Sequence, residues 1–366
     1  MTAPRSLETL VREEIRDAGP MSVARFMALA LGHPAHGYYM TRDPLGRDFT
    51  TSPEISQMFG ELIGLWIADL WARMGRPDPV LVAEPGPGRG TLMADALRAA
   101  AILPGFAAAA RIHLVETSPV LSETQAQTLA PIIARHGYRT PQWHKDIAGL
   151  PAGPLIMVAN EFFDALPIRQ IVCAKGAWRE RCIVETASGG LAFAPSPVPL
   201  ADLHDLPGMA EAADGTIVEL APAAGAIAST VAARLAREGG GALIIDYGHT
   251  RSGPGDTLQA MRGGTFVPVL EAPGEADLTA HVDFEALAAA ARAGGAAIHG
   301  PVTQGAFLNA LGIGERADRL MAAASPGQRD AIRVARERLT APDAMGSLFK
   351  AIALVQPGLI PAGFAP

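Results

Sequence analysis

A glycine-rich turn behind an apolar, acid-ended segment is the feature that most constrains the fold of this chain. Residues 79–83 are apolar, Glu84 follows them, and residues 92–98 have the apolar spacing of an amphipathic helix. Between these segments, glycine stands at every second position: Gly86, Gly88 and Gly90. A strand, a glycine loop and a helix form the first unit of a nucleotide-binding α/β domain, so the sequence predicts such a domain here.

The spacing of the glycines distinguishes this loop from two other nucleotide-binding loops. A dinucleotide fingerprint would place its third glycine at position 91, where the chain has Thr91, and the Gly-Lys-Ser/Thr of a P-loop is absent. What remains is the E-x-G-x-G-x-G pattern of methyltransferases that bind S-adenosylmethionine (SAM), in which glycine lets the backbone approach the methionine part and the ribose. A tight turn that binds nothing is the alternative. We assign these residues to a cofactor site: Glu84, Gly86, Gly88 and Gly90.

Two further predicted strands end in acids. Residues 111–115 lead to Glu116, 26 positions after Gly90. At this position of SAM and dinucleotide folds, a carboxylate accepts hydrogen bonds from both ribose hydroxyls. Asp146 ends the third strand, where the adenine amino group would lie. We predict that both acids bind the cofactor; a solvent-facing acid and an ordinary turn acid are the respective alternatives.

The fourth predicted strand, residues 153–160, leads into a loop in which two acids flank two phenylalanines. Ligands of open α/β sheets bind beyond the carboxyl ends of the strands. Asn160, Glu161 and Asp164 should therefore converge where a methyl group would be delivered. We predict them as the catalytic residues.

Helices are predicted on the N-terminal side of the glycine loop. Two span residues 6–31, and a longer one runs from Ser52, as its N-cap, to about Met74. Hydroxyl groups crowd the start of the longer helix, and free N–H groups at a helix N-terminus can hold a carboxylate. Residues 50–54 could thus close over a ligand, and we count Thr51 and Ser52 as cofactor-binding; an ordinary helix cap is the equal alternative.

The remaining segments complete the sheet. We expect a hairpin over 168–185, a helix over about 222–238, strands over 241–248, 296–302 and 348–355, and helices over 304–340. The fold class is then α/β, a Rossmann-like sheet of seven strands. We place an N-terminal helical cap at 1–75 and the cofactor domain at 76–366, with insertions at about 168–216 and 249–280. The cap and the insertions would cover the carboxyl edge of the sheet.

The charge balance disfavours nucleic acid as a partner. The 366 residues carry a formal net charge of −7, whereas a surface for phosphate backbones is positive. This balance does not exclude a small RNA site, and an acidic face would also suit a basic protein substrate. With 49% hydrophobic and 18% charged residues, the chain can form a large core.

Targeting signals are not evident. No segment approaches the roughly 18 uninterrupted apolar residues of a membrane span, and residues 1–16 lack the apolar core of a signal peptide. We expect no membrane insertion and a cytoplasmic location in a bacterium, or the mitochondrial matrix in a eukaryote. Cys173 and Cys182 could face each other across the hairpin as a reduced, buried pair.

A histidine and an aspartate near residue 280 admit two interpretations. His281 and Asp283 could be a general base and the residue that orients it. A helix start with Asp283 as N-cap is the interpretation that we favour. No other His or Cys stands at ligand spacing, and we predict no metal site.

Five segments together resemble the MidA family of class I SAM-dependent methyltransferases. They are residues 48–54, 84–90, 159–167, 245–248 and 279–284. The resemblance covers about residues 20–355; the first and third segments are specific to the family, whereas the glycine loop occurs in many methyltransferases. The family includes a mitochondrial assembly factor of respiratory complex I that methylates arginine on a core subunit.

This resemblance implies a Rossmann-like fold whose last strand is antiparallel, SAM as the cofactor, and a protein arginine as the methyl acceptor. A core subunit of complex I is the implied candidate partner. A guanidinium acceptor needs carboxylates that orient it and hold its charge. We expect Glu161 and Asp164 to do this, and Asn160 to support the methionine end of SAM.

Two other functions stay open. One is a small-molecule or RNA methyltransferase on the same fold, and the other is a SAM-binding assembly chaperone without catalysis. The sequence also leaves the oligomeric state open, a homodimer included.

Overall fold

A mostly parallel sheet places the glycine loop at its carboxyl edge. The computed structural model describes residues 6–41, 51–200 and 212–364. The strands that correspond to the predicted sheet are β2 (Val80–Pro85), β3 (Ala110–Val115), β4 (Gln142–His144), β5 (Leu155–Asn160), β10 (Gly240–His249), β15 (Ala297–Thr303) and β16 (Phe349–Val355). They follow one another in the order β15-β16-β10-β5-β2-β3-β4.

The direction of the strands confirms the predicted fold. Neighbouring strands from β10 to β4 are parallel, whereas β16 is antiparallel to both β10 and β15. The predicted Rossmann-like sheet with an antiparallel last strand is therefore present. Because parallel strands end at the same edge, the segments that follow β2, β3, β4 and β5 all begin at the carboxyl edge.

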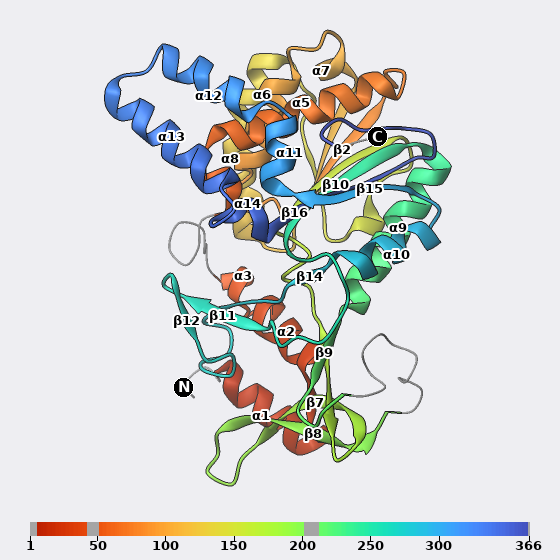
Figure 1. Cartoon of the computed structure of the whole chain (residues 1–366), viewed down its shortest axis with the longest axis vertical. Coiled ribbons are helices and arrows are strands. Elements are labelled where there is room, and N and C mark those ends of the chain that lie inside the picture. Colours follow the sequence, from red (N-terminus) through yellow and green to blue (C-terminus); the bar gives the residue numbers. More distant parts are fainter. Residues whose placement is uncertain (1–5, 42–50, 201–211, 365–366) are drawn as a thin grey trace. The chain divides into compact units, whose positions relative to one another are not determined.

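Helices cover both faces of the sheet (Figure 1). Parallel strands are usually buried on both faces, and β2 and β5 are buried along their whole length. One apolar core joins the sheet to α5 (Gln57–Arg73), α6 (Thr91–Ala100), α7 (Phe106–Ala109), α8 (Pro119–His136), α11 (Gln304–Ala310), α12 (Ile313–Ala322), α13 (Pro326–Thr340) and α14 (Met345–Leu348). Most of α9 (Pro222–Glu238) and α10 (Phe284–Ala293) lies on the other face.

The chain forms two units that are each built from non-contiguous segments. The sheet unit comprises residues 50–163, 226–249 and 286–366. The insertion unit comprises residues 1–49, 164–225 and 250–285. The N-terminal helices and the two predicted insertions thus gather into one unit. Our expectation that this unit covers the carboxyl edge of the sheet stays a prediction.

The first domain boundary lies earlier than the expected position near residue 75. The structure divides between residues 49 and 50, because α5 packs closely against α6. A Cβ atom added at Gly64 would lie 2.2 Å from the carbonyl oxygen of Ala96, and one added at Gly60 would lie 2.5 Å from Cβ of Asp95. Two glycines on α5 therefore let the two helices approach, and α5 belongs to the sheet unit.

The helix expected to run unbroken from Ser52 is interrupted. A short helix, α4 (Ser52–Ile55), precedes α5, and Thr51 rather than Ser52 is its N-cap residue. Ser56 has extended backbone angles and accepts a hydrogen bond from the backbone N–H of Met58. A serine that caps the following helix thus ends α4 and begins α5. The expected segment 48–50 lies outside the described residues.

The insertion unit contains the two predicted N-terminal helices and two small sheets. Its helices are α1 (Leu7–Ala18), α2 (Val23–Gly32) and α3 (Tyr38–Thr41). One sheet contains β1 (Met21–Ser22), β6 (Arg169–Ala174), β7 (Ala177–Glu185), β8 (Leu191–Pro199) and β9 (Ile217–Leu220). The other contains β11 (Gln259–Arg262), β12 (Thr265–Val267) and β13 (Asp277–Thr279), and a short strand, β14 (Val282–Asp283), precedes α10.

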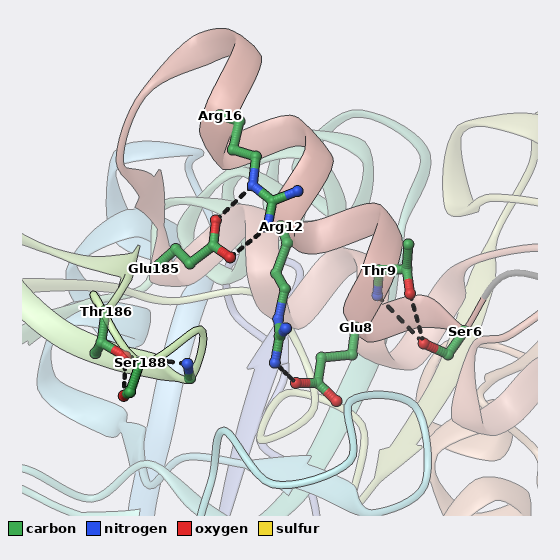
Figure 2. A network of polar contacts seen from close by, with 9 residues as sticks. Ser6, Glu8, Thr9, Arg12, Arg16, Glu185, Thr186 and Ser188 are labelled. Carbon is green, nitrogen blue, oxygen red and sulfur yellow. Dashed lines mark hydrogen bonds and ion pairs between the residues drawn. The ribbon is translucent and has the colours of Figure 1, made fainter.

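Polar contacts connect the N-terminal helix to the insertion hairpin. Figure 2 shows Arg16 of α1 in a two-pronged ion pair with Glu185 at the end of β7, in which Nε of Arg16 donates over 2.6 Å. At the start of α1, Ser6 accepts from the backbone N–H of Thr9, as expected of an N-cap. Apolar side chains of α1 and α2 also share a buried cluster with residues of β7 and β13.

The predicted hairpin is present with a two-residue turn at Lys175 and Gly176, both left-handed at φ 54° and 69°. Its register pairs Cys173 with Trp178. Our expectation that Cys173 and Cys182 could face each other across the hairpin is therefore wrong, although both are buried, free cysteines. Within the three described stretches, no helix is long and apolar enough to cross a membrane.

The approach of α5 to α6 predicts a selective effect of one methyl group. Gly64→Ala should lower the free energy of unfolding by about 1–3 kcal/mol, because the new Cβ atom would overlap α6. Thermal and denaturant unfolding measure this change. The control is Gly327→Ala on α13, where a Cβ atom would meet no atom within 4 Å and the stability should hold or rise slightly. Equal stability of Gly64→Ala and the wild type would contradict the close packing.

Candidate cofactor-binding and catalytic site

The glycine loop needs glycine for its backbone conformation. Gly86, Gly88 and Gly90 have φ values of 63°, 53° and 81°, in the left-handed region that other residues seldom adopt. Gly90 is the N-cap residue of α6. A Cβ atom at Gly86 would lie 3.0 Å from the ring of Phe162, which follows β5. The loop is therefore compact, and the segment after β5 packs directly on it.

Glu116 lies directly after β3 and is buried, so the interpretation as a solvent-facing acid is wrong. Its Oε1 accepts from the backbone N–H of Ser118 over 2.7 Å, and its Oε2 accepts from Nε2 of Gln125 over 3.0 Å. Burial raises the pKa of Glu116, and these hydrogen bonds oppose the rise. The backbone N–H of Thr117 is a further donor to this carboxylate, which leaves it about one more accepting position.

Three buried polar atoms along this edge have no hydrogen-bond partner among the described residues. They are Oε2 of Glu84, Oδ1 of Asn160 and Oγ of Ser52. A buried polar atom without a partner costs about 1–3 kcal/mol, so a ligand that supplies donors and an acceptor would recover this free energy. The ammonium and carboxylate groups of a methionine moiety supply both. The residues present therefore fit the methionine end of SAM.

Burial leaves Glu84 with an unusual protonation equilibrium. Its side chain is almost wholly shielded from solvent, and this burial raises the pKa of Glu84 to about 8. A nearby ammonium group would favour the charged carboxylate and lower this pKa again. Glu84 therefore has the properties of a group that exchanges a proton when a cationic ligand binds.

The loop after β5, residues 161–164, which we predict to be catalytic, is held by backbone contacts. Glu161 has a left-handed φ of 50°, which is rare for a residue with a side chain. Its Oε1 accepts from the backbone N–H of Ser52 over 2.9 Å and from Nδ2 of Asn160 over 3.1 Å. Asp246 on β10 accepts from the backbone N–H groups of Phe162 and Phe163, over 3.2 and 3.0 Å. The loop is thus fixed from both sides.

The segment expected to close over a ligand lies against the start of α6. Oγ1 of Thr91, the first residue of α6, donates to Oε1 of Glu54 over 2.6 Å. The backbone N–H of Ser52 contacts Glu161, as described above, whereas the side chain of Thr51 makes no capping hydrogen bond. Residues 51–55 therefore connect the start of α6 with the loop after β5, and their role in cofactor binding stays a prediction.

Asp164 and Asp146 lie in different surroundings from the other assigned residues. Asp164 is buried in the insertion unit, where its backbone carbonyl accepts from Ala280 over 3.0 Å. Burial is the main reason why the pKa of Tyr39 lies well above its ordinary value, and the negative charges of Asp277 and Asp164 add to this effect. Asp146 is exposed, two residues after β4, and accepts from the backbone N–H of Gly149 over 2.7 Å. The contacts of Asp146 match an ordinary turn acid, and its adenine contact stays a prediction.

Sequence reasoning missed two residues that organise this edge. Asp246 was used only as part of a family motif and was not assigned to the site. Its position directly after the apolar run 241–245 is the signal that marks it as an acid at the carboxyl edge. Gln125 lies in the middle of α8 and carries no motif. His281 and Asp283 both lie in the insertion unit, and α10 begins at Phe284, directly after Asp283, as the favoured interpretation expects.

Comparisons with known proteins identify the family of this chain. Residues 62–302 match the family described as "Putative S-adenosyl-L-methionine-dependent methyltransferase". The chain is 38% identical to the Drosophila melanogaster protein named protein arginine methyltransferase NDUFAF7 homolog, mitochondrial, over 98% of this chain and 86% of that protein. It is also 38% identical to the Homo sapiens protein arginine methyltransferase NDUFAF7, mitochondrial, over 93% of this chain and 81% of that protein.

A solved structure is similar over nearly the whole chain. It is a crystal structure of a Burkholderia thailandensis protein bound to S-adenosyl-homocysteine (SAH). The two chains are 29% identical, with a TM-score of 0.83 over 98% of this chain and 93% of the other.

The raised pKa predicts opposite effects of Glu84→Gln on stability and binding. The unfolded carboxyl group loses its proton near pH 4.3, whereas the folded group keeps it to about pH 8. The wild type should therefore lose stability relative to Glu84→Gln as the pH rises from about 5 to about 8. Melting temperatures measure this difference, and calorimetry should show weaker SAH binding by the variant. The control is Glu123→Gln, at an exposed position of α8; a pH-independent difference in melting temperature would contradict the burial argument.

Proposed function

Because the chain belongs to a family of SAM-dependent methyltransferases, we propose that it transfers the methyl group of SAM to an arginine side chain of a protein. The observation that carries the proposal is the identity to relatives named as protein arginine methyltransferases, at 38% over 93–98% of the chain. The fixed acidic loop beside the glycine loop supports it, because carboxylates suit a guanidinium.

The carboxyl edge of the sheet would hold the cofactor. In this proposal, the glycine loop lies under the methionine part and ribose, Glu116 accepts from the ribose hydroxyls, and Asp146 contacts the adenine. Glu84, Asn160, Thr51 and Ser52 would hold the methionine end. SAM supplies an electrophilic methyl group, so the chain's own task is to position two partners in line.

Glu161 is the residue that we assign to the acceptor. Its carboxylate is held by Ser52 and Asn160. It lies between the end of β5 and Phe162, which packs on the glycine loop. A fixed carboxylate can orient a guanidinium and balance its charge while the nitrogen attacks. Asp164, three positions later, is assigned the same task. The strained backbone at Glu161 agrees with a functional position.

A core subunit of respiratory complex I is the acceptor protein that we place first, because the family resemblance implies it. We place the enzyme in the cytoplasm of a bacterium or in the matrix of a mitochondrion. A homodimer is one oligomeric state in this proposal. The net charge of −7 disfavours RNA as the substrate. A small-molecule acceptor and a SAM-binding chaperone without catalysis are the competing functions.

Label transfer distinguishes these functions. The protein, incubated with methyl-labelled SAM and the quinone-proximal core subunit of complex I, should place the label on arginine, as located by mass spectrometry. Binding of both molecules without transfer would favour the chaperone. Label that appears only on small molecules from a host extract would favour a small-molecule enzyme. A variant that cannot bind SAM, Gly88→Val, is the negative control, since a side chain would enter the cofactor space.

Replacement of Glu161 separates catalysis from cofactor binding. Glu161→Gln keeps the oxygen that accepts from Ser52 and Asn160 but removes the negative charge. We expect the turnover number to fall by about 100-fold or more, because charge stabilisation at the acceptor is lost. SAH affinity, measured by calorimetry, should stay within a factor of about 3. Glu123→Gln should leave both quantities unchanged, and wild-type turnover of Glu161→Gln would remove Glu161 from this role.

A further inference from the structure

We propose that Gln125 is a positioning residue that holds Glu116 and the glycine loop in the arrangement needed to bind the ribose of SAM. The inference rests on the cofactor-binding part of the proposed function and is independent of the methyl acceptor. Gln125 lies in α8, is fully buried, and carries no sequence motif. A buried polar residue needs compensating hydrogen bonds, and two of the three partners of Gln125, Gly88 and Glu116, belong to the candidate cofactor site.

Gln125 contacts three elements that are far apart in the sequence. Its Nε2 donates to Oε2 of Glu116 over 3.0 Å and to the carbonyl oxygen of Gly88 over 2.8 Å. Its Oε1 accepts from Nε1 of Trp143, on β4, over 2.9 Å. The amide therefore joins the ribose-binding acid, the glycine loop and the strand that leads to the predicted adenine contact.

The chemistry of these partners allows only one orientation of the amide. An indole N–H can only donate, whereas a carboxylate and a carbonyl oxygen can only accept. If the amide were rotated by half a turn, two acceptors would face an oxygen and one donor would face an N–H group. Both amide hydrogens are thus used, and the geometry of Glu116 depends on Trp143 through Gln125.

The same contacts leave Glu116 with capacity to accept from the ribose. Ser118 donates to one oxygen of the carboxylate and Gln125 to the other, and the backbone N–H of Thr117 is a third donor. A carboxylate has about four accepting positions, so about one stays available for a ribose hydroxyl. The hydrogen bonds from Ser118 and Gln125 also oppose the effect of burial on the pKa of Glu116 and so favour the charged form.

Gln125 also sets the position of the glycine loop relative to α8. A Cβ atom at Gly90 would lie 3.4 Å from the Cα atom of Gln125, so the helix packs closely against the loop at this residue. The hydrogen bond to the Gly88 carbonyl fixes the middle of the loop at the same place. The side chain of Gln125 therefore contacts both the glycine loop and Glu116, which would bind the same ribose.

The test compares SAH with its 2′-deoxy analogue, using calorimetry on the full-length protein. Gln125→Met keeps a similar volume but removes the amide. Wild-type protein should prefer SAH, and in Gln125→Met the affinity for SAH should fall by about 10-fold or more, as expected for loss of a hydrogen bond to a charged group. The affinity for the deoxy analogue should fall much less, so that the preference for the ribose shrinks.

The pH dependence gives a second readout that a purely structural residue would not change. Without Gln125, the pKa of Glu116 should rise further, and SAH affinity should be lost at a higher pH in the variant than in the wild type as the pH falls. Gln127→Met, at an exposed position of the same helix, is the matched control and should bind as the wild type does. Trp143→Phe should reduce the ribose preference in the same direction, and it serves as the test if Gln125→Met does not fold.

Two results would overturn the inference. One is an equal loss of affinity for SAH and its deoxy analogue with an unchanged pH profile, which would make Gln125 a packing residue. The other is unchanged SAH affinity in Gln125→Met. Failure of the arginine acceptor assay would leave these binding results unaffected, so the two proposals are tested separately.

Discussion

Buried carboxylates along the carboxyl edge of the sheet are the constraint on which the site depends. Asp246 uses its carboxylate for backbone N–H groups and thereby fixes the loop after β5. Glu116 accepts from Ser118, Gln125 and Thr117, whereas Oε2 of Glu84 has no donor among the described residues. The capacity left for a ligand is therefore greatest at Glu84. This difference separates the acid that builds the edge from the acids that suit a cofactor.

The glycine loop illustrates why fold and function are difficult to separate in such a sequence. Left-handed backbone at Gly86, Gly88 and Gly90 requires glycine even without a ligand. The packing of Phe162 on Gly86 and of Gln125 on Gly90 adds a steric requirement from the protein itself. The loop alone is thus compatible with a turn that binds nothing. The unsatisfied oxygens around it are what favour a ligand.

Sequence patterns predicted the sheet well because apolar strands with acids behind them have a strong signal, as β2 and β3 show. They predicted the wrong course for the helix after Ser52, because a serine at position 56 can cap a new helix as readily as it can sit inside one. They also missed Gln125, since a helical glutamine gains its role only from Gly88, Glu116 and Trp143, which the fold brings to it. The insertion unit consists of three segments that are far apart in the sequence. Their association could not be predicted, because it depends on tertiary contacts such as that of Arg16 with Glu185.

Electrostatics connect the acidic edge with the proposed acceptor. The sulfonium of SAM and a guanidinium are both cations, and two unit charges about 4 Å apart repel by about 4 kcal/mol at an effective dielectric constant near 20. A site for such a pair must supply negative charge before the two groups can meet. Glu161 offers a carboxylate held in place by Ser52 and Asn160. Burial raises the pKa of Glu84 to about 8, so an approaching cation favours loss of its proton. A neutral acceptor would need less of this charge. The acidic edge therefore favours a cationic acceptor over a neutral one. The buried carboxyl group of Glu84 destabilises the fold least while the site is empty and this group is protonated.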